Sequence, residues 1–325
     1  MNIRSIKSPF IILVLLLVLS VVSISCFGDI DQTSLMTTDR SAALLVPDTS
    51  LELYVYAKQE RPTSIPAEIA NLSRDVLVDT MAIWGLPSEQ GMIFGAGLTF
   101  DSAEDASSIY SDIKLEENVW KTLQDNKVYV VKGSGNEAES LKSAITNNSF
   151  KYYTNGAVLE SVSILPRGGR TNLIAIAIAK PTKQVMEFAE ANIPQEAYLQ
   201  IERVLKLLDA DVIIGGLYSP HQINIAKAVE SFQSGGNISS LEAGALILIK
   251  SGMPGFVMNP VVRSVLVDYD FKETNLNDSV AYKKVVAIDD ENEIPILVRV
   301  EGDYIFIATS WQEAYAQVLL TSIYK

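Results

Sequence analysis

Hydrophobic and polar residues alternate in several short stretches of this chain. In residues 51–57, Leu51, Leu53, Val55 and Ala57 point one way, while Glu52 and two tyrosines point the other. This period of two is typical of a half-buried strand. Residues 172–179 are apolar on both faces, which predicts a strand in the middle of a sheet. Further strands are predicted over residues 91–100, 211–218, 244–250, 280–288 and 294–308.

Apolar residues three and four positions apart predict helices between these strands. Residues 66–84 have this spacing, with Pro66 near the start. The residues from Asp101 to Glu104 look like a capping box that opens a helix. Ser219 and Pro220 would cap and start another helix. Helices are also predicted over residues 181–191, 195–208 and 254–267.

Two segments share one pattern of strand, short turn, strand and capped helix. They span residues 119–145 and 295–321, an offset of 176 (295 − 119). The turns are expected at 125–126 and 301–303. Ser134 and Ser310 would open the two helices, each with a glutamate three residues later. Turn, cap and period agree although few side chains are identical, so the pattern predicts an internal repeat.

The predicted fold class is α+β, in two similar halves of mixed or antiparallel sheet with helices on one face. Duplicated ferredoxin-like units are the best single model for these halves. The first half would span residues 44–150 and the second residues 151–325, with the join around 146–171. The two halves could share one continuous sheet.

The N-terminus has the parts of an export signal. Arg4 and Lys7 are basic, residues 9–24 are apolar, and Ser25 is a small residue before Cys26. A basic start, an apolar middle and a small-residue exit are typical of a secretory signal. The apolar run is shorter than the ~20 residues of a comfortable membrane-spanning helix.

Cys26 at this position resembles the lipobox of bacterial lipoproteins. The resemblance implies that residues 1–25 are a signal peptide that is removed, and that Cys26 carries the lipid, including acyl chains such as palmitate. Residues 27–43 would then form a tether between the lipid anchor and the folded part. This chain departs from the family's pattern in having Ser23 where a branched apolar residue is usual. Two alternatives stay open: an uncleaved N-terminal transmembrane anchor, and an ordinary cleaved secretory signal.

A second resemblance concerns the body of the chain. Two short segments resemble sequence motifs in uncharacterised bacterial exported-protein families: residues 46–50 (VPDTS) before the first strand, and the late hairpin at 302–307. That resemblance implies no activity.

Composition narrows the classes of partner. The chain has 26 basic and 39 acidic residues and a formal net charge of −13, which argues against binding to nucleic acid and against electrostatic adhesion to anionic lipid. With 48% hydrophobic residues it is globular. Its single cysteine excludes an internal disulfide, and lipidation would consume a thiol that is otherwise unpaired in an oxidising compartment.

No residue set predicts catalysis, a metal site or a cofactor. His221 is the only histidine, so neither a two-histidine metal site nor a second general base is available. The sequence contains no nucleophile-elbow motif. The acidic run 289–293 lacks the spacing of a calcium loop and reads as a turn. Residues 133–135 (GSG) read as a helix cap, because the lysine of a phosphate-binding loop is missing. Trp84, Trp120 and Trp311 could line a groove, but core packing is the commoner role.

The functional prediction is a lipid-anchored exported protein at the outer face of the cell membrane, acting by binding or structural interaction and not as an enzyme. Its partners would be the membrane, through the lipid on Cys26, and an envelope protein or small-molecule ligand. A tethered solute-binding receptor for a transporter is one alternative, and a cofactor-free carboxylate hydrolase is a weaker one. A deep cleft lined by Trp and Tyr would favour the receptor, and two facing carboxylates in a cleft would favour the hydrolase.

Overall fold

The computed structural model describes most of the chain downstream of the predicted tether, and the account below concerns those residues. Cys26 and His221 fall outside these residues. So does the part of the helix predicted from Ser219 that follows Pro220. The described residues are 45–48, 50–58, 78–89, 91–113, 118–152, 156–166, 171–192, 195–220, 243–277, 279–287 and 293–323.

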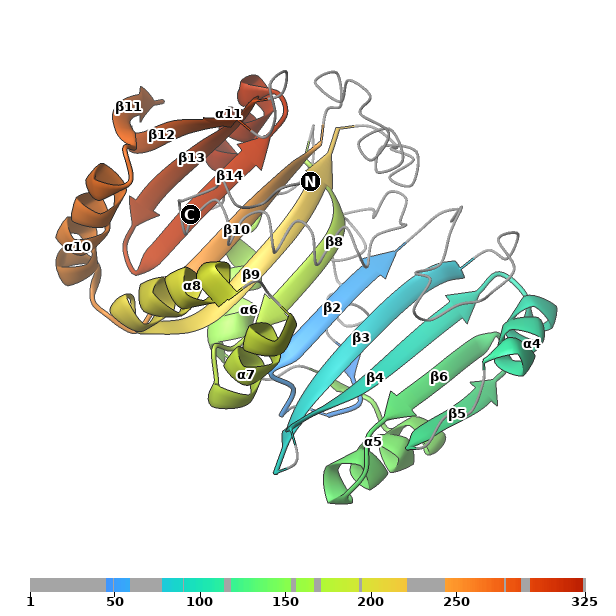
Figure 1. Cartoon of the computed structure of the whole chain (residues 1–325). Helices are drawn as coiled ribbons and strands as arrows, with labels where there is room; N and C mark the ends of the chain where they lie inside the picture. Colours follow the sequence, from blue (N-terminus) through green and yellow to red (C-terminus); the bar gives the residue numbers. More distant parts are fainter. Residues whose placement is uncertain are drawn as a thin grey trace.

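Twelve strands form one continuous antiparallel sheet (Figure 1). Their order is β11-β12-β13-β14-β10-β9-β8-β2-β3-β4-β6-β5. A separate short pair joins β1 (Leu45–Val46) and β7 (Lys151–Tyr152). The strands of the large sheet are β2 (Leu53–Lys58), β3 (Val78–Ser88), β4 (Gly91–Phe100), β5 (Val119–Gln124), β6 (Lys127–Lys132), β8 (Asn172–Ala179), β9 (Ala210–Ser219), β10 (Gly244–Ser251), β11 (Lys272–Leu276), β12 (Ser279–Ala287), β13 (Glu293–Glu301) and β14 (Tyr304–Ser310).

Helices cover both faces of this sheet, so the expectation of helices on one face was wrong. One face carries α5 (Asn136–Thr146), α6 (Gly156–Ile164) and α11 (Glu313–Thr321). The other carries α4 (Ala103–Asp112), α7 (Lys183–Asn192), α8 (Gln195–Leu207) and α10 (Gly255–Asp268) (Figure 1). Strand β10 shows the reason. Leu246 and Leu248 pack into the cluster that contains α11, while Ile247 and Ile249 pack with α8 and α10. A strand that is apolar on both faces needs cover on both.

The order of strands is the same on either side of the β2–β8 pair. Reading outward, one side runs β2-β3-β4-β6-β5 and the other runs β8-β9-β10-β14-β13, after which β12 and β11 are added. The registers match as well, because on each side one row of directly opposed residues crosses all five strands. These rows are Ala57, Met81, Leu98, Val128 and Leu123 on one side, and Ala179, Ile213, Ile249, Ile305 and Val300 on the other.

Duplicated ferredoxin-like units stay a prediction. All pairs between the described strands are antiparallel. Such pairing is compatible with a ferredoxin-like unit, because its split β-α-β connection skips the strand in between. The α+β class and the continuous sheet are confirmed, and β8 lies next to its centre as its apolar faces predicted.

Both predicted hairpins are present. Gln124 pairs with Lys127 around one turn, and Glu301 pairs with Tyr304 around the other. The offset between the hairpins is therefore 177 (301 − 124), one more than the sequence alignment implies. Both turns place their first residue in the left-handed region, with φ of 52° at Asp125 and 61° at Gly302.

The helices that follow these hairpins begin at Asn136 and Glu313, which are also 177 apart. Their N-cap positions are Gly135 and Gln312, so the predicted serine caps were wrong. The hydroxyl of Ser310 donates to the Ala243 carbonyl at 2.6 Å instead, which ties β14 to the start of β10.

A helix predicted over residues 66–84 was wrong for the part that the structure describes. Residues from Val78 onward form β3, which pairs with β2 on one side and β4 on the other. Pairing along its whole length outweighs a weak helical spacing. Residues 66–77 lie outside the described part. The helix after residue 101 is confirmed, but its cap is Ser102, whose hydroxyl accepts from the Asp105 N–H at 3.0 Å.

Candidate functional site

A cluster of charged and aromatic residues lies at one end of the sheet, where β10 ends and β14 begins. In the strand register Lys250 is directly opposite Tyr304, and Tyr304 is directly opposite Glu301. The next row inward contains Leu248, Phe306 and Arg299. Every second residue of a strand lies on the same face of the sheet. The polar row is therefore on the face that α6 and α11 cover, next to its apolar residues. We call Glu160, Lys250, Arg299, Glu301 and Tyr304 the strand-end cluster.

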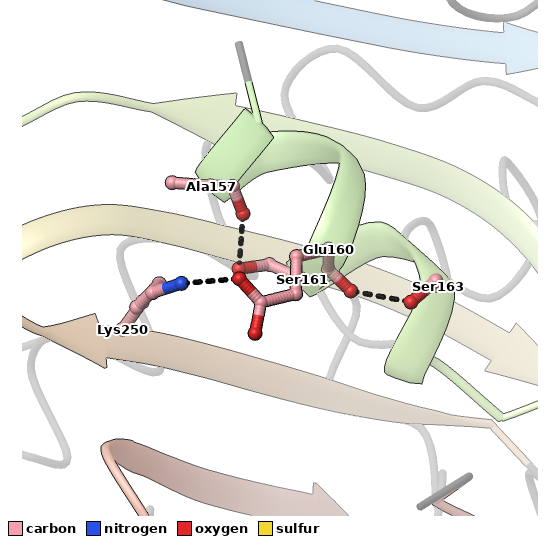
Figure 2. A network of polar contacts seen from close by, with 5 residues as sticks. All are labelled: Ala157, Glu160, Ser161, Ser163 and Lys250. Atoms are coloured by element: carbon pink, nitrogen blue, oxygen red, sulfur yellow. Dashed lines mark hydrogen bonds and ion pairs between the residues drawn. The ribbon is translucent and has the colours of Figure 1, made fainter.

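Helix α6 brings Glu160 over this row (Figure 2). The Glu160 carboxylate accepts from the Lys250 ammonium at 2.5 Å. Two hydroxyl groups bond to the backbone of α6 itself. Ser161 donates to the Ala157 carbonyl at 2.7 Å, and Ser163 donates to the Glu160 carbonyl at 2.6 Å. Lys250 is mostly buried, with 14% of its side chain exposed, whereas Glu160 is 56% exposed. The ion pair therefore joins a surface carboxylate to a buried ammonium.

The ring of Tyr304 and that of its neighbour Phe306 lie between two cations. The Lys250 ammonium is 5.4 Å from the centre of the Tyr304 ring, and the Tyr304 and Phe306 rings stack with centres 6.0 Å apart. The Arg299 guanidinium lies 5.5 Å from the centre of the Phe306 ring and 3.3 Å from the Glu301 carboxylate. Both distances between cation and ring are within the range of cation–π attraction.

Burial and pairing shift the pKa values in opposite ways. The hydrogen bond from Lys250 and the nearby Tyr304 lower the pKa of Glu160. Burial by itself would lower the pKa of Lys250, but Glu160 and Tyr304 outweigh it and the pKa is raised. Burial lowers the pKa of Arg299 against the opposing effect of Glu301, and burial raises the pKa of Tyr304. The lowered pKa of Glu160 and the raised pKa of Lys250 both favour the charged forms of this pair.

Two buried polar atoms of the cluster make no hydrogen bond within the described structure: the Tyr304 hydroxyl and the Arg299 Nε. Each of these residues is only 7% exposed. The strand-end cluster contains no histidine or cysteine, and its serine neighbour is committed to the α6 backbone. The pair of Lys250 and Glu160 holds α6 against β10.

The residues singled out in the sequence are dispersed, and the strand-end cluster includes none of them. Cys26 and His221 lie outside the described residues, as do all of residues 289–293 except Glu293, which begins β13. Residues 133–135 form the junction between β6 and α5, with φ of 142° at Gly133 and 99° at Gly135.

The tryptophans do not form a groove in the described structure. Trp84 is a core residue with 2% exposure, and its ring stacks with that of Tyr129 at 6.3 Å. Trp120 lies on the edge strand β5, half-buried. Trp311 lies between β14 and α11, at the other end of the chain.

Sequence reasoning missed the strand-end cluster. Lys250 is the one polar residue of the stretch GALILIK and stands at its end. A lysine at the end of a strand is commonly exposed. Its partner Glu160 is 90 positions away in a helix that the sequence did not predict. The one available signal was Arg299 inside the apolar run 294–308, because a buried arginine needs a partner.

The described residues contain neither a metal-binding cluster nor a membrane-crossing helix. No group of three or more histidine, cysteine, aspartate or glutamate residues is placed there to hold a metal ion. Within the same residues, no helix has the length and apolar character needed to cross a membrane.

Comparisons with known proteins returned little. No family model and no curated protein matches the chain. Among solved structures, two crystal forms of the protein TP0453 are similar over most of the chain. Form I is 11% identical and covers 84% of this chain and 94% of that one, with a TM-score of 0.37. Form III is 10% identical and covers 83% and 94%, with a TM-score of 0.36. Both TM-scores lie below 0.5, so we infer nothing about this chain from either structure.

Proposed function

We propose that this chain is an exported protein, anchored by lipid at Cys26 to the outer face of the cell membrane, and that it acts by binding or structural interaction in the cell envelope. The observation that carries the proposal is the N-terminal sequence. A basic start and an apolar run end at the only cysteine, with Ser25 as the small residue before it.

A non-enzymatic role is supported by the way the buried charges are used. Lys250 is paired with Glu160, and Arg299 is paired with Glu301. The first pair joins α6 to β10, and the second lies within β13, so both pairs serve the packing of the sheet. The extended sheet, with helices on both faces, provides edges and helix surfaces for a partner.

We further infer that the body of the protein consists of two duplicated halves. Support comes from the matching strand order on either side of the β2–β8 pair and from the matching rows of opposed residues. The two hairpins and the helices after them share one offset of 177 and the same turn conformation. An approximate two-fold axis would pass through the Val55–Ala177 pair at the centre.

Replacing Cys26 by alanine tests the anchor. Cells that produce the wild-type chain and are fed radiolabelled palmitate should yield a labelled band, and Cys26→Ala should abolish the label and leave uncut precursor. Ser25→Ala is the matched control, because it keeps a small residue at the same junction and should preserve both label and processing. Labelling that persists in Cys26→Ala would overturn the proposal.

The binding role calls for an independent measurement. Mass spectrometry of what co-purifies with the detergent-solubilised native protein should find a specific envelope protein in a fixed ratio. A small solute in a fixed ratio, and no protein, would instead support the receptor alternative.

A further inference from the structure

The two edges of the large sheet are protected to different degrees. Edge strand β11 has exposed charges at Lys272 and Glu273, and Glu273 pairs with Arg263 at 3.3 Å. Natural sheets use such charges to prevent other strands from adding to an edge. Edge strand β5 has a single charge, Lys121. Its ammonium is turned back over α4, where it donates to the carbonyls of Tyr110 at 2.5 Å and Ile113 at 2.7 Å. The β5 edge is therefore the less protected one.

The hydrogen-bond register shows which backbone groups of β5 point outward. Gln124 and Lys127 close a two-residue hairpin, and the Gly133 N–H donates to the Asn118 carbonyl at 2.9 Å. In an antiparallel pair the residues that bond to the neighbouring strand alternate. Even-numbered residues of β5 thus bond to β6, and the N–H and C=O groups of Val119, Lys121 and Leu123 point away from the sheet. No strand lies beyond β5 in the described part of the chain.

On the other side of the sheet, the position equivalent to this edge is occupied. Strand β13 matches β5 at the offset of 177, and its outer edge pairs with β12. There Val298 is opposite Tyr282 and Ile296 is opposite Lys284. Subtracting the offset gives Lys121 (298 − 177) and Val119 (296 − 177), the same residues whose backbone groups point outward on β5. Within the described residues, the chain adds a strand at one of the two matching edges and none at the other.

We propose that the β5 edge binds an extended segment of a partner protein, which adds antiparallel to β5 in the place that β12 takes on β13. Main-chain hydrogen bonds to Val119 and Lys121 hold the segment, as in other cases of strand addition to a sheet edge. The proposal depends on strand register and is independent of the lipid anchor.

The chemistry of the partner segment follows from β12 and from the charge of the chain. In β12 (SVAYKKVVA) Lys283 pairs at 2.6 Å with Glu313, the first residue of α11. In the matching helix α5 the position of Glu313 is taken by Asn136 (313 − 177), and Glu137 and Glu139 in the same first turn supply the carboxylates. A segment with alternating apolar residues and a lysine or arginine toward α5 fits this edge. A second copy of the chain fits poorly, because each copy has a net charge of −13.

A synthetic peptide of residues 279–287 provides the probe. In β12 the residues Tyr282 and Lys284 bond toward β13, whereas Ala281 and Lys283 bond toward β11. We expect the fluorescently labelled peptide to bind the purified full chain saturably. N-methylation at Tyr282 and Lys284 should weaken binding by about tenfold per lost hydrogen-bonded pair, and N-methylation at Ala281 and Lys283 should leave it within twofold.

Amide hydrogen exchange locates the site on the intact chain. The peptide should slow exchange at Val119 and Lys121 and leave β11 unchanged. Val119→Lys adds a charge to the β5 edge and should reduce peptide binding, and Asn275→Lys makes the same change on the β11 edge and should not. Thermal melts of both variants check that they fold.

Four outcomes would overturn the proposal. They are the absence of saturable binding, an equal loss with both methylated peptides, protection confined to β11, and a dimer of the chain that Val119→Lys dissociates. The last result would assign the edge to a second copy in place of a basic partner segment.

Discussion

The Lys250 ammonium lies 2.5 Å from the Glu160 carboxylate, although the two residues are 90 positions apart in the chain. Glu160 belongs to α6, which follows the first hairpin and its helix, and Lys250 belongs to β10 in the second half of the sheet. The ion pair thus fixes α6 onto β10.

Glu160→Gln should destabilise the protein by about 1 kcal/mol, because it leaves the mostly buried Lys250 without its carboxylate. The value lies toward the low end for buried pairs because Glu160 is half-exposed and screened by solvent. Chemical denaturation of the wild type, both single variants and the double variant with Lys250→Met gives the coupling energy. The exposed pair Lys183–Glu187 is the control, and Glu187→Gln should change stability little. A double variant as unstable as the sum of the singles would contradict the account.

The same pair predicts how stability depends on pH. The folded-state pKa of Glu160 is lowered, so its contribution is present above the unfolded pKa of about 4.3 and is lost as pH falls through the folded value. The folded-state pKa of Lys250 is raised, so its contribution is present below about 10.4 and is lost as pH rises through the folded value. The difference in melting temperature between wild type and the double variant should be constant near neutral pH and shrink at both extremes. A difference that grows in acid would contradict the assignment.

Gly255→Ala should destabilise the protein by about 2 kcal/mol or more. A Cβ atom at Gly255 would lie 2.2 Å from the backbone carbonyl oxygen of Gly302, and neither backbone can move away without disturbing the start of α10 or the β13–β14 turn. Gly156→Ala is the matched control, since nothing lies within 4 Å of a Cβ there. Urea unfolding of both variants makes the comparison, and equal midpoints would show that the Gly255–Gly302 contact is wrong.

Lys121→Met should weaken the attachment of α4, because the Lys121 ammonium donates to the Tyr110 and Ile113 carbonyls at the end of that helix. We expect a loss of about 1–2 kcal/mol. Lys127→Met, at an exposed position on the neighbouring strand, serves as the control and should lie near wild type. Hydrogen exchange should speed up in α4 for Lys121→Met only. Exchange that is unchanged there would mean that the lysine does not cap the helix.

The sequence predicted most of the sheet because its strands have strong local signals. The alternation in β2, the doubly apolar β8 and β10, and both hairpins with their following helices were identified from pattern alone. The residues that cap the helices were not. The Ser310 hydroxyl donates to the Ala243 carbonyl across the sheet and accepts from the Gln312 N–H, and Gln312 itself occupies the cap position. Strand β3 was mistaken for a helix because its apolar spacing fits both periods, and only pairing with β2 and β4 decides between them.

The strand-end cluster could not be predicted because it depends on long-range register. Lys250 is opposite Tyr304, and Tyr304 is opposite Glu301, only once β10, β14 and β13 are aligned. The side of the sheet on which α6 packs is likewise a tertiary property. Short-range patterns contain neither the register nor the side on which α6 packs. Arg299 within an apolar run was a local signal of a buried charge, but no prediction was made from it.

The intact mass of the protein extracted from membranes of its native host tests the central claim most directly. The account predicts a mature chain that begins at Cys26 and carries the added mass of a diacylglyceryl group on its sulfur. A chain that begins at Met1, or one that retains Cys26 without any added lipid mass, would contradict it.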